Sequence, residues 1–588
     1  MLNLFKIKKL INNKKNFSNL KLIFFLNFIN FILELMAILS IPIFVSLLID
    51  KNYLIEKYNI QISLYLVNYN PITIMSIIVI FLFLFKNVFY FFLIYKQSRL
   101  IKEIKITTSE KVFNMYLFGS YMNHLSKDPS TLTRDTTYSV QSFGFYLFNL
   151  INLFREIISI MFIVLLLFFI KPLIVLVSVT FFLLIAFIFK RSIKKILTKK
   201  ANENEKLNEL FSKDVFNTFL SIKDIKILKK ESDSIKKFKS KIYKLENNLF
   251  FFQILERLPK SILEILSIIF LLIVSLVLFN VIKDKVELFT VLSLFLVATV
   301  RLLPSFTSVI SSLNYLKIFE PGLITLFNEI EKPIKSDNAY QKDFQEYYPK
   351  KIDVKQLIIV EKLTFGFNDN NHFLKDINLK IFQGEMNCII GETGSGKSTI
   401  FNLMLGLLEP ESGNIYYQGK NIKPDISNWY EAISLVSQDP YLFNDSIINN
   451  ITFNILENEI DKKKLNKAIK ISELSETIAK LPKGLNTKVS SQSINLSGGE
   501  KQRIALARAI YKNSNILFLD EFTNAIDDKT ENKIMQNLRE LKNITLIIIS
   551  HRKSTIEQCD KIWKLENNKI TLVKKENSTI INGILKKN

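Results

Sequence analysis

The stretch Gly391-Glu-Thr-Gly-Ser-Gly-Lys-Ser-Thr399 decides the fold of the C-terminal part of this chain. It follows the apolar run 388–390 and precedes the apolar segment 400–408, which has helical character. A strand, a glycine-rich loop and a helix in this order form a phosphate-binding P-loop. Glycines let several backbone N–H groups turn toward one phosphate, and the start of the helix adds its positive end. A plain glycine turn would not account for the strand and helix on either side.

Two side chains of this loop have expected roles. Lys397 would reach the β and γ phosphates of a nucleotide, and Ser398 would be a ligand of Mg²⁺. The other positions expected around the phosphates are Gly391, Glu392, Thr393, Gly394, Ser395, Gly396 and Thr399.

Two further motifs complete the predicted site. The apolar strand 516–519 ends in Asp520 and Glu521, which places Asp520 to hold Mg²⁺ and Glu521 to polarise the attacking water. The second motif is Ser497-Gly498-Gly499-Glu500. No Lys-Ser follows these glycines, so they do not form a second P-loop, but they can present N–H groups and the Ser497 hydroxyl to a γ-phosphate.

In this order the motifs resemble the ATP-binding cassette (ABC) family, and the resemblance covers residues 352–575. It implies that Gln438 links Mg²⁺ and the attacking water to the membrane domain, and that Asp527 belongs to the D-loop. It also implies that His551 contacts the γ-phosphate and that Phe367 stacks on adenine. A Gln, His or Phe on its own is more often a structural residue. The shared order and spacing of these residues favour the functional interpretation.

The chain departs from the family pattern at several positions. Glu500 stands where the signature motif usually ends in Gln, and Ser-Ser-Gln-Ser at 490–493 replaces the usual Gly-Glu-x-Gly. In the family this loop usually contacts the long helices of a second chain, and the change at 490–493 puts that contact in doubt. Phe522 and Asn524 replace commoner small residues after Glu521.

The chain as a whole has the composition of a membrane protein with a soluble part. Of 588 residues, 48% are hydrophobic, and apolar runs long enough to cross a bilayer predict six spans. The two cysteines, Cys388 and Cys559, are too few for a disulfide framework and are expected to be reduced. The six spans are placed at 22–49, 71–95, 145–170, 172–189, 261–282 and 288–312.

Basic residues predict the orientation. The segments 1–20, 96–142 and 190–258 hold 30 Lys or Arg, whereas the opposite loops hold five. By the positive-inside rule the first set is cytoplasmic, so both termini face the cytoplasm. The net charge of +24 comes without an RNA or DNA motif, and no nucleic acid is expected as a partner.

The predicted fold is multidomain. An all-α polytopic membrane domain, with six transmembrane helices and long cytoplasmic extensions, takes residues 1–330. A polar linker follows at 331–351, and the α/β P-loop ABC cassette takes 352–588.

The predicted span 145–170 carries Arg155 and Glu156, and four more charged residues lie within the other predicted spans: Glu34, Lys86, Glu264 and Arg301. Charges in hydrocarbon are costly and usually face an interior or a cavity. Two readings are open: mutual ion pairing within the bundle, or a role in the passage of substrate.

One cassette and six spans look like an exporter-type half-transporter, which implies a second chain, identical or related, and ATP and Mg²⁺ as cofactors. The stretches 298–305, 441–446 and 557–560 look like bacterial flippases of lipid-linked oligosaccharides in the inner membrane. Arg301 would then suit a pyrophosphate. A lipid or drug exporter shares every motif, and an ATP-gated channel or signalling protein is a further alternative.

Overall fold

The computed structural model describes residues 2–11, 14–50, 71–170, 172–331, 356–368, 371–424, 426–453, 457–489, 496–541 and 543–573. These residues fall into two compact units. One comprises residues 1–117 and 126–334, and the other residues 118–125 and 335–588. The predicted linker, 331–351, lies outside the described residues except for Glu331.

The first unit is helical. Its long helices are α2 (Lys14–Ile49), α4 (Pro71–Leu117), α7 (Val140–Ile170), α8 (Pro172–Leu220), α10 (Glu231–Val281) and α11 (Lys285–Glu331). Shorter elements are α1 (Leu2–Ile11), α6 (Pro129–Arg134), the π-helical turn η2 (Asp135–Ser139) and α9 (Ile222–Ile227).

Within the described residues, five helices are long and apolar enough to cross a membrane: α2, α4, the continuous helix Pro129–Ile170, α10 and α11. The predicted span 172–189 forms the first part of α8 but is not one of these five. Pro172 opens α8 directly after α7, where its missing N–H costs no helical hydrogen bond. The helices continue well beyond the apolar runs, as the predicted extensions require.

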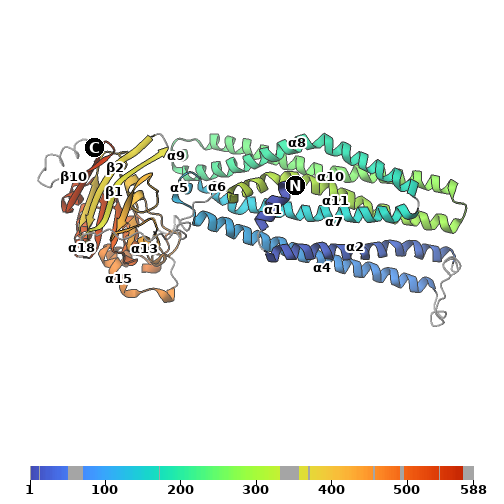
Figure 1. Cartoon of the computed structure of the whole chain (residues 1–588), viewed down its shortest axis with the longest axis horizontal. Helices are drawn as coiled ribbons and strands as arrows, with labels where there is room; N and C mark the ends of the chain where they lie inside the picture. The colour runs from blue at the N-terminus through green and yellow to red at the C-terminus, as the bar shows by residue number, and fades with distance from the viewer. Residues whose placement is uncertain are drawn as a thin grey trace. The chain divides into compact units, whose positions relative to one another are not determined.

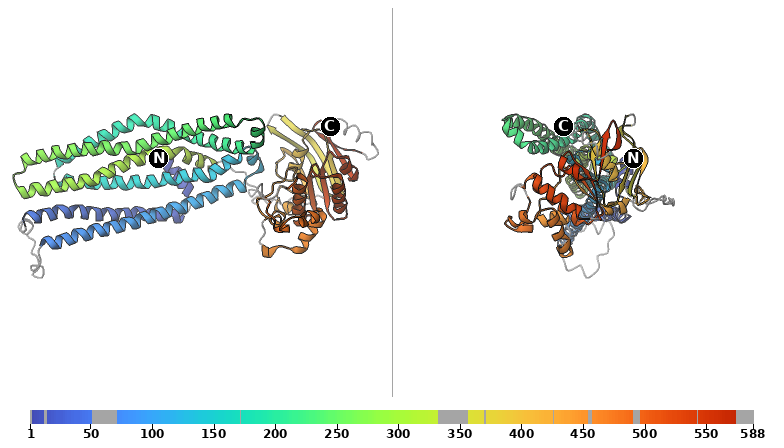
Figure 2. Two further views of the ribbon diagram at one scale, coloured as in Figure 1. Left: turned by 180° about the vertical axis from the view of Figure 1, so that it is seen from behind. Right: turned by 90° about the vertical axis from the view of Figure 1, so that its left-hand side faces the viewer.

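Apolar side chains from several helices form the core of the bundle. Figures 1 and 2 show α2 and α4 running side by side, and α7 packs along α11. One buried cluster joins Ile38, Ile163, Val175, Leu278 and Phe295, which come from α2, α7, α8, α10 and α11. Many large apolar side chains stay exposed on the outer faces, for example Phe91 and Ile265, as expected of helices in lipid.

The second unit is an α/β domain with ten strands in the described residues. They are β1 (Gln356–Asn368), β2 (Asn371–Phe382), β3 (Met386–Ile390), β4 (Ser412–Tyr417), β5 (Lys420–Asn421), β6 (Ile433–Val436), β7 (Ile516–Asp520), β8 (Thr545–Ile549), β9 (Lys561–Glu566) and β10 (Lys569–Val573).

Its helices are α5 (Tyr121–Leu125), α12 (Lys397–Met404), α13 (Ile426–Ala432), α14 (Ile447–Thr452), α15 (Lys462–Ile471), α16 (Ser475–Ala479), α17 (Gly498–Tyr511), α18 (Asp528–Arg539) and α19 (Lys553–Gln558). Short 3-10 turns occur at Glu457–Glu459 and Gly484–Asn486.

The strands form two sheets. One is antiparallel with the order β2-β1-β4-β5, and the other has the order β10-β9-β3-β8-β7-β6. In the larger sheet β9, β3, β8, β7 and β6 are parallel neighbours, so their carboxyl ends share one edge. Strands β3 and β8 are buried along their whole length, which explains why they are mostly apolar, with Asn387 and Thr545 as their polar residues. Cys388 and Cys559 are both buried and free in this core.

Candidate functional site

The predicted nucleotide residues gather at the carboxyl edge of the larger sheet. The glycine loop leaves β3, and His551 follows β8. Asp520 ends β7 with Glu521 directly after it, and Gln438 follows β6. These four strands are adjacent in the sheet order. Residues spread over more than a hundred positions of sequence therefore meet because parallel strands end at one edge.

The glycines of the loop are needed for its shape. Gly394 and Gly396 have φ angles of +80° and +104°, which side chains rarely allow. A Cβ at Gly391 would lie 2.6 Å from the carbonyl oxygen of Leu565 in β9. The loop is thus a tight backbone turn just before α12. A Cβ at Gly394 would meet no atom of the described residues within 4 Å, which leaves room beside the loop for another molecule.

Lys397 folds back over this loop. Its Nζ donates hydrogen bonds to the carbonyl oxygens of Gly391 (2.8 Å) and Glu392 (2.9 Å). Burial lowers the pKa of Lys397, while Glu521 and Asp520 act to raise it. The hydroxyl of Ser395 is buried with no hydrogen-bond partner among the described residues. A phosphate group would satisfy that hydroxyl and accept from Lys397, so the loop fits a nucleotide.

Glu521 is held by three side chains. Its Oε2 accepts hydrogen bonds from Gln438 (2.9 Å) and Asn524 (2.8 Å), and its Oε1 lies 3.4 Å from Nε2 of His551. The φ of Glu521 is +45°, a strained value for a residue with a side chain. Burial, and secondly the charge of Lys397, lower the pKa of His551, while the charge of Glu521 acts to raise it.

Asp520 has the features of a cation ligand. Burial and the neighbouring Glu521 raise its pKa to about 6, with Lys397 acting in the opposite direction. A divalent cation would stabilise this crowded pair of carboxylates. No group of three or more His, Cys, Asp or Glu side chains among the described residues could hold a metal by itself. A Mg²⁺ ion here would use Asp520, Ser398 and Gln438 together with phosphate oxygens, as Mg²⁺ commonly does.

The signature residues start helix α17. Ser497 is the N-cap: its hydroxyl accepts from the N–H of Glu500 (3.2 Å), and its own N–H donates to the Glu500 carboxylate (2.7 Å). Glu500 therefore completes a capping box, a structural role that does not require the Gln usual in the family. Ser497 and Gly498 are exposed at this helix start.

Asp527 caps the next helix. Its carboxylate accepts from the N–H of Thr530 (2.9 Å) at the start of α18, and that hydrogen bond lowers the pKa of Asp527. Ala525, two residues earlier, packs on the signature glycines: a Cβ at Gly499 would lie 2.6 Å from its carbonyl oxygen. The D-loop and signature segments are thus in contact within one cassette.

The side chains of some predicted residues lie outside the described part of the structure, and for two others only the degree of exposure is informative. Phe367 belongs to β1, but its side chain lies outside the described part of the structure. The altered loop at 490–493 lies outside it as well. Thr393 is exposed in the loop, and Thr399 is half-buried in α12.

A second polar cluster lies in the helical bundle. Arg301 on α11 pairs with Glu34 on α2, and its Nη2 lies 3.8 Å from Glu156 on α7. Arg155 also pairs with Glu156, at 3.0 Å. Ser305 donates to Glu156 (2.8 Å) and Ser159 to Glu34 (3.2 Å). We call Glu34, Arg155, Glu156 and Arg301 the bundle ion network.

Of Glu34, Lys86, Glu264 and Arg301, the structure brings only two together. Glu34 and Arg301 are partners, whereas Glu264 lies exposed on α10. Lys86 lies over the ring of Phe83, 5.2 Å from its centroid. The geometry of Glu34 and Arg301 matches the ion-pairing reading.

Sequence reasoning missed two residues of these clusters. Asn524 was visible only as a departure from the family, with no sign that it bonds Glu521. Glu156 was visible as a charge within a span, next to Arg155. Its spacing to Arg301 gives no signal, because the two helices meet only in the folded bundle.

Comparisons with known proteins agree with this geometry. Residues 374–524 match the ABC transporter family. The chain is 39% identical over 214 residues to the mitochondrial iron-sulfur clusters transporter ATM1 of Kluyveromyces lactis, covering 35% of this chain and 29% of that protein. It is 34% identical over 288 residues to the ATP-dependent lipid A-core flippase of Vibrio cholerae, covering 48% and 47%.

These alignments span less than half the length of either relative. Among solved structures, a bacterial Atm1-family ABC exporter with ATP bound matches with a TM-score of 0.72 at 21% identity, over 94% of both chains. Residues 374–524 thus match the ABC transporter family, and the chain as a whole has the fold of an ABC exporter.

Proposed function

We propose that this chain is one half of an ATP-driven exporter. The observation that carries the proposal is the meeting of Lys397, Asp520 and Glu521 at one sheet edge, with Gln438 and His551 bonded to or touching Glu521. Bound Mg²⁺ would supply positive charge to the phosphates. Lys397 would leave its two loop carbonyls for phosphate oxygens, and Glu521 would orient the attacking water.

The site needs a second chain. Ser497 and Gly498 are exposed at the start of α17, where N–H groups and the helix dipole favour an anion. In the proposed dimer these groups close over the nucleotide held by the P-loop of the partner chain. Both Glu521 and His551 are present, so a homodimer would have two competent sites; a heterodimer with a related chain is the alternative.

The proposed cycle couples this closure to the bundle. ATP would draw the cassettes together, the long helices would carry the movement, and the spans would change from inward-facing to outward-facing. Hydrolysis would reset the cycle. The proposed location is the inner membrane, with the cassette and both termini in the cytoplasm, because Lys and Arg concentrate on that side.

The decisive test uses Glu521→Gln in reconstituted vesicles. ATP hydrolysis should fall by about 10³-fold, the order of magnitude for loss of an essential catalytic group, while ATP binding persists. Glu476→Gln, an exposed change on α16, should leave hydrolysis unchanged and is the matched control. Hydrolysis at the normal rate in Glu521→Gln would overturn the assignment.

The proposed substrate is an amphipathic molecule, with a lipid-linked oligosaccharide as the first candidate. Its support is the local resemblance around Arg301 and the guanidinium chemistry that suits a pyrophosphate. Because Arg301 pairs with Glu34 and lies near Glu156, a pyrophosphate would have to displace carboxylates from it. A lipid or drug exporter is the second candidate.

Substrate-stimulated ATP hydrolysis separates these candidates. Stimulation by a polyprenyl-diphosphate sugar, lost in Arg301→Gln, supports the first; stimulation by amphiphilic drugs alone supports the second. Vesicle flux that persists unchanged in Glu521→Gln would instead indicate an ATP-gated channel.

A further inference from the structure

Arg552 ties the loop after β8 to the segment after β7. It follows His551 directly in the sequence. Its Nη2 donates a hydrogen bond to the carbonyl oxygen of Asn524 (3.2 Å), and its Nη1 donates to Glu531 and to Asp528 (3.2 Å). The Asp528 side chain is exposed, so solvent screens its pair with Arg552. The contacts with Asn524 and Glu531 are therefore the ones that hold the guanidinium.

Glu531 on α18 anchors this guanidinium. It is fully buried, and its carboxylate also accepts hydrogen bonds from the hydroxyls of Ser554 (3.2 Å) and Thr555. These donors belong to residues 552–555, directly after His551. Burying a carboxylate is costly, and apolar side chains would pack α18 against α19 at least as well. What the carboxylate adds is a fixed position for Arg552.

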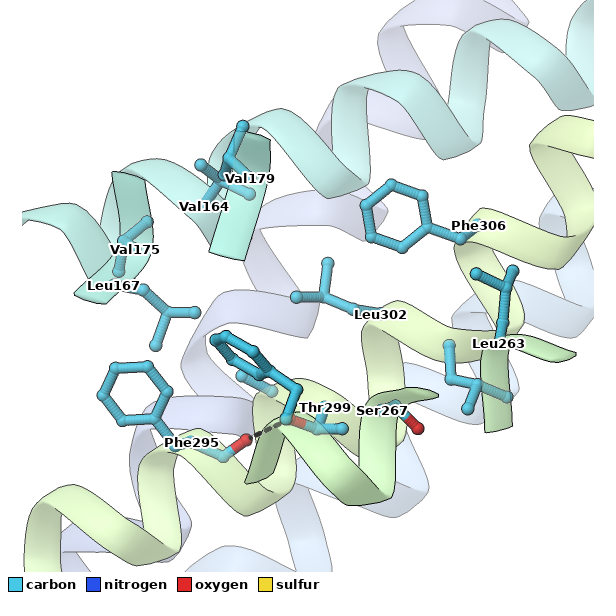
Figure 3. A pocket seen from close by; sticks show the side chains of 13 residues that line it. Val164, Leu167, Val175, Val179, Leu263, Ser267, Phe295, Thr299, Leu302 and Phe306 are labelled. Carbon is cyan, nitrogen blue, oxygen red and sulfur yellow. Dashed lines mark hydrogen bonds between the residues drawn. The ribbon is translucent and has the colours of Figure 1, made fainter. Parts of the chain in front are cut away.

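A polar side chain of the helical bundle shows the contrast. Beside a small cavity of about 40 Å³, the Thr299 hydroxyl donates to the carbonyl oxygen of Phe295 (2.8 Å), one turn earlier on the same helix (Figure 3). Such a bond satisfies the hydroxyl and ties no other element to its helix. The donors to Glu531 instead lie 21 to 24 residues further along the chain, so they join two separate segments.

These contacts close a ring around the Glu521 carboxylate. The side-chain amide of Asn524 donates to Oε2 of Glu521 (2.8 Å), and Nε2 of His551 lies 3.4 Å from Oε1. Arg552 joins the far sides of these two partners, because it is bonded to the backbone of Asn524 and follows His551 in the chain. A shift of Arg552 would therefore move both groups that face the carboxylate.

We propose that Arg552, anchored by Glu531, is a positioning residue for ATP hydrolysis, which sets how Asn524 and His551 lie around Glu521. The inference rests on the proposed ATPase function and adds two residues to it. The partners of Arg552 belong to the segments after β7 and β8, whereas the glycine loop follows β3. The turnover rate should therefore depend on Arg552, and the binding of ATP should not.

Arg552→Lys is the principal test. It keeps the positive charge beside Glu531 and removes the planar fork that reaches Asn524 at the same time. In reconstituted protein kcat for ATP hydrolysis should fall by about tenfold, the order expected for one hydrogen bond from a charged group, while KM for ATP stays nearly constant. Glu531→Gln is the second variant: it keeps the volume of the anchor, weakens its hold on Arg552 and should lower kcat several-fold in the same pattern.

Arg539→Lys is the matched control. Arg539 is also on α18, and its ion pair with Asp560 (3.5 Å) joins this helix to the start of β9, away from His551. The same change of side chain there should leave kcat unchanged. A loss of kcat in this control equal to that in Arg552→Lys would overturn the proposal.

Coupling to Asn524 separates positioning from a general loss of stability. In the Asn524→Ala background, Arg552→Lys should lower kcat by only about threefold, because part of its effect passes through the missing amide. The full tenfold loss in that background, or a rise in KM in place of the fall in kcat, would overturn the proposal. Normal kcat in Arg552→Lys and Glu531→Gln, with hydrolysis stopped in Glu521→Gln, would overturn this inference alone. Absence of hydrolysis by the parent chain would overturn the proposed function as well.

Discussion

Asn524 donates a hydrogen bond of 2.8 Å to Oε2 of Glu521, the same oxygen that accepts from Gln438. Glu521 has a strained backbone with φ of +45°, and the two amide hydrogen bonds fix the orientation of its carboxylate. Asn524 is therefore a positioning residue for the proposed catalytic carboxylate.

Asn524→Ala should lower kcat for ATP hydrolysis by about tenfold and leave KM for ATP little changed. A hydrogen bond to a charged group contributes about 1.5–3 kcal/mol, and Gln438 would still hold Glu521 in part. Steady-state kinetics on reconstituted protein measures both constants. Asn421→Ala, which removes an amide on the separate antiparallel sheet, is the control; a normal kcat in Asn524→Ala would contradict the positioning role.

The pKa of Asp520, raised by burial to about 6, predicts a pH dependence of Mg²⁺ binding. Protons compete with Mg²⁺ for the carboxylate, so affinity for Mg²⁺ with ATP should fall as pH drops below about 6, approaching tenfold per unit. Mg²⁺ titrations between pH 5 and 7.5 measure it. Asp520→Asn should bind weakly at every pH and lose this dependence.

Stability should respond in a defined direction as well. The folded chain keeps the Asp520 proton to a higher pH than the unfolded chain does, because the folded pKa is raised. This group therefore contributes stability below its unfolded pKa, and that contribution is lost as pH rises through about 6. Comparing thermal unfolding of Asp520→Asn with the parent across this range isolates the effect; parallel curves would contradict it.

The bundle ion network should be strongly coupled. Arg301→Met leaves Glu34 and Glu156, which are 3% and 5% exposed, without their shared cation, and should destabilise the bundle by about 3–5 kcal/mol. Adding Glu34→Gln should recover part of the loss, since one uncompensated charge is gone. Thermal unfolding of the two single variants and the double variant in detergent measures this coupling. Lys86→Met, a span cation that lies over Phe83, should cost less; additive losses would argue against coupling.

Glu500 should tolerate the family's usual residue. Glu500→Gln keeps an oxygen that accepts from the Ser497 N–H, so stability should change by less than about 0.5 kcal/mol. Glu500→Ala breaks the capping box and should cost about 1 kcal/mol. Chemical denaturation of the purified protein distinguishes the two. Equal losses in both variants would show that the carboxylate charge matters rather than the cap.

Much of this protein could be predicted from local patterns. The glycine loop before Lys397 predicts the P-loop because its geometry is made by consecutive residues, and φ angles of +80° and +104° at Gly394 and Gly396 agree with that need. Long apolar runs predict the spans because a helix in lipid satisfies its own backbone. The predicted span 172–189 forms the first part of α8. Helix α8 is not one of the five helices in the described residues that meet the length and hydropathy criteria for a span.

Contacts between segments that are distant along the chain could not be predicted from local sequence patterns. Nothing in the sequence near Asn524 indicates that it bonds Glu521 beside Gln438, and nothing near Arg301 indicates Glu156 as its neighbour.

The sequence by itself determined the chemistry of the nucleotide loop and the membrane character of the helices, since both depend on residues close along the chain. Only the tertiary structure decided which carboxylates surround Arg301 and which amides hold Glu521. Packing makes those choices, because helix crossings and the shared edge of parallel strands bring side chains within hydrogen-bond distance regardless of their separation in sequence.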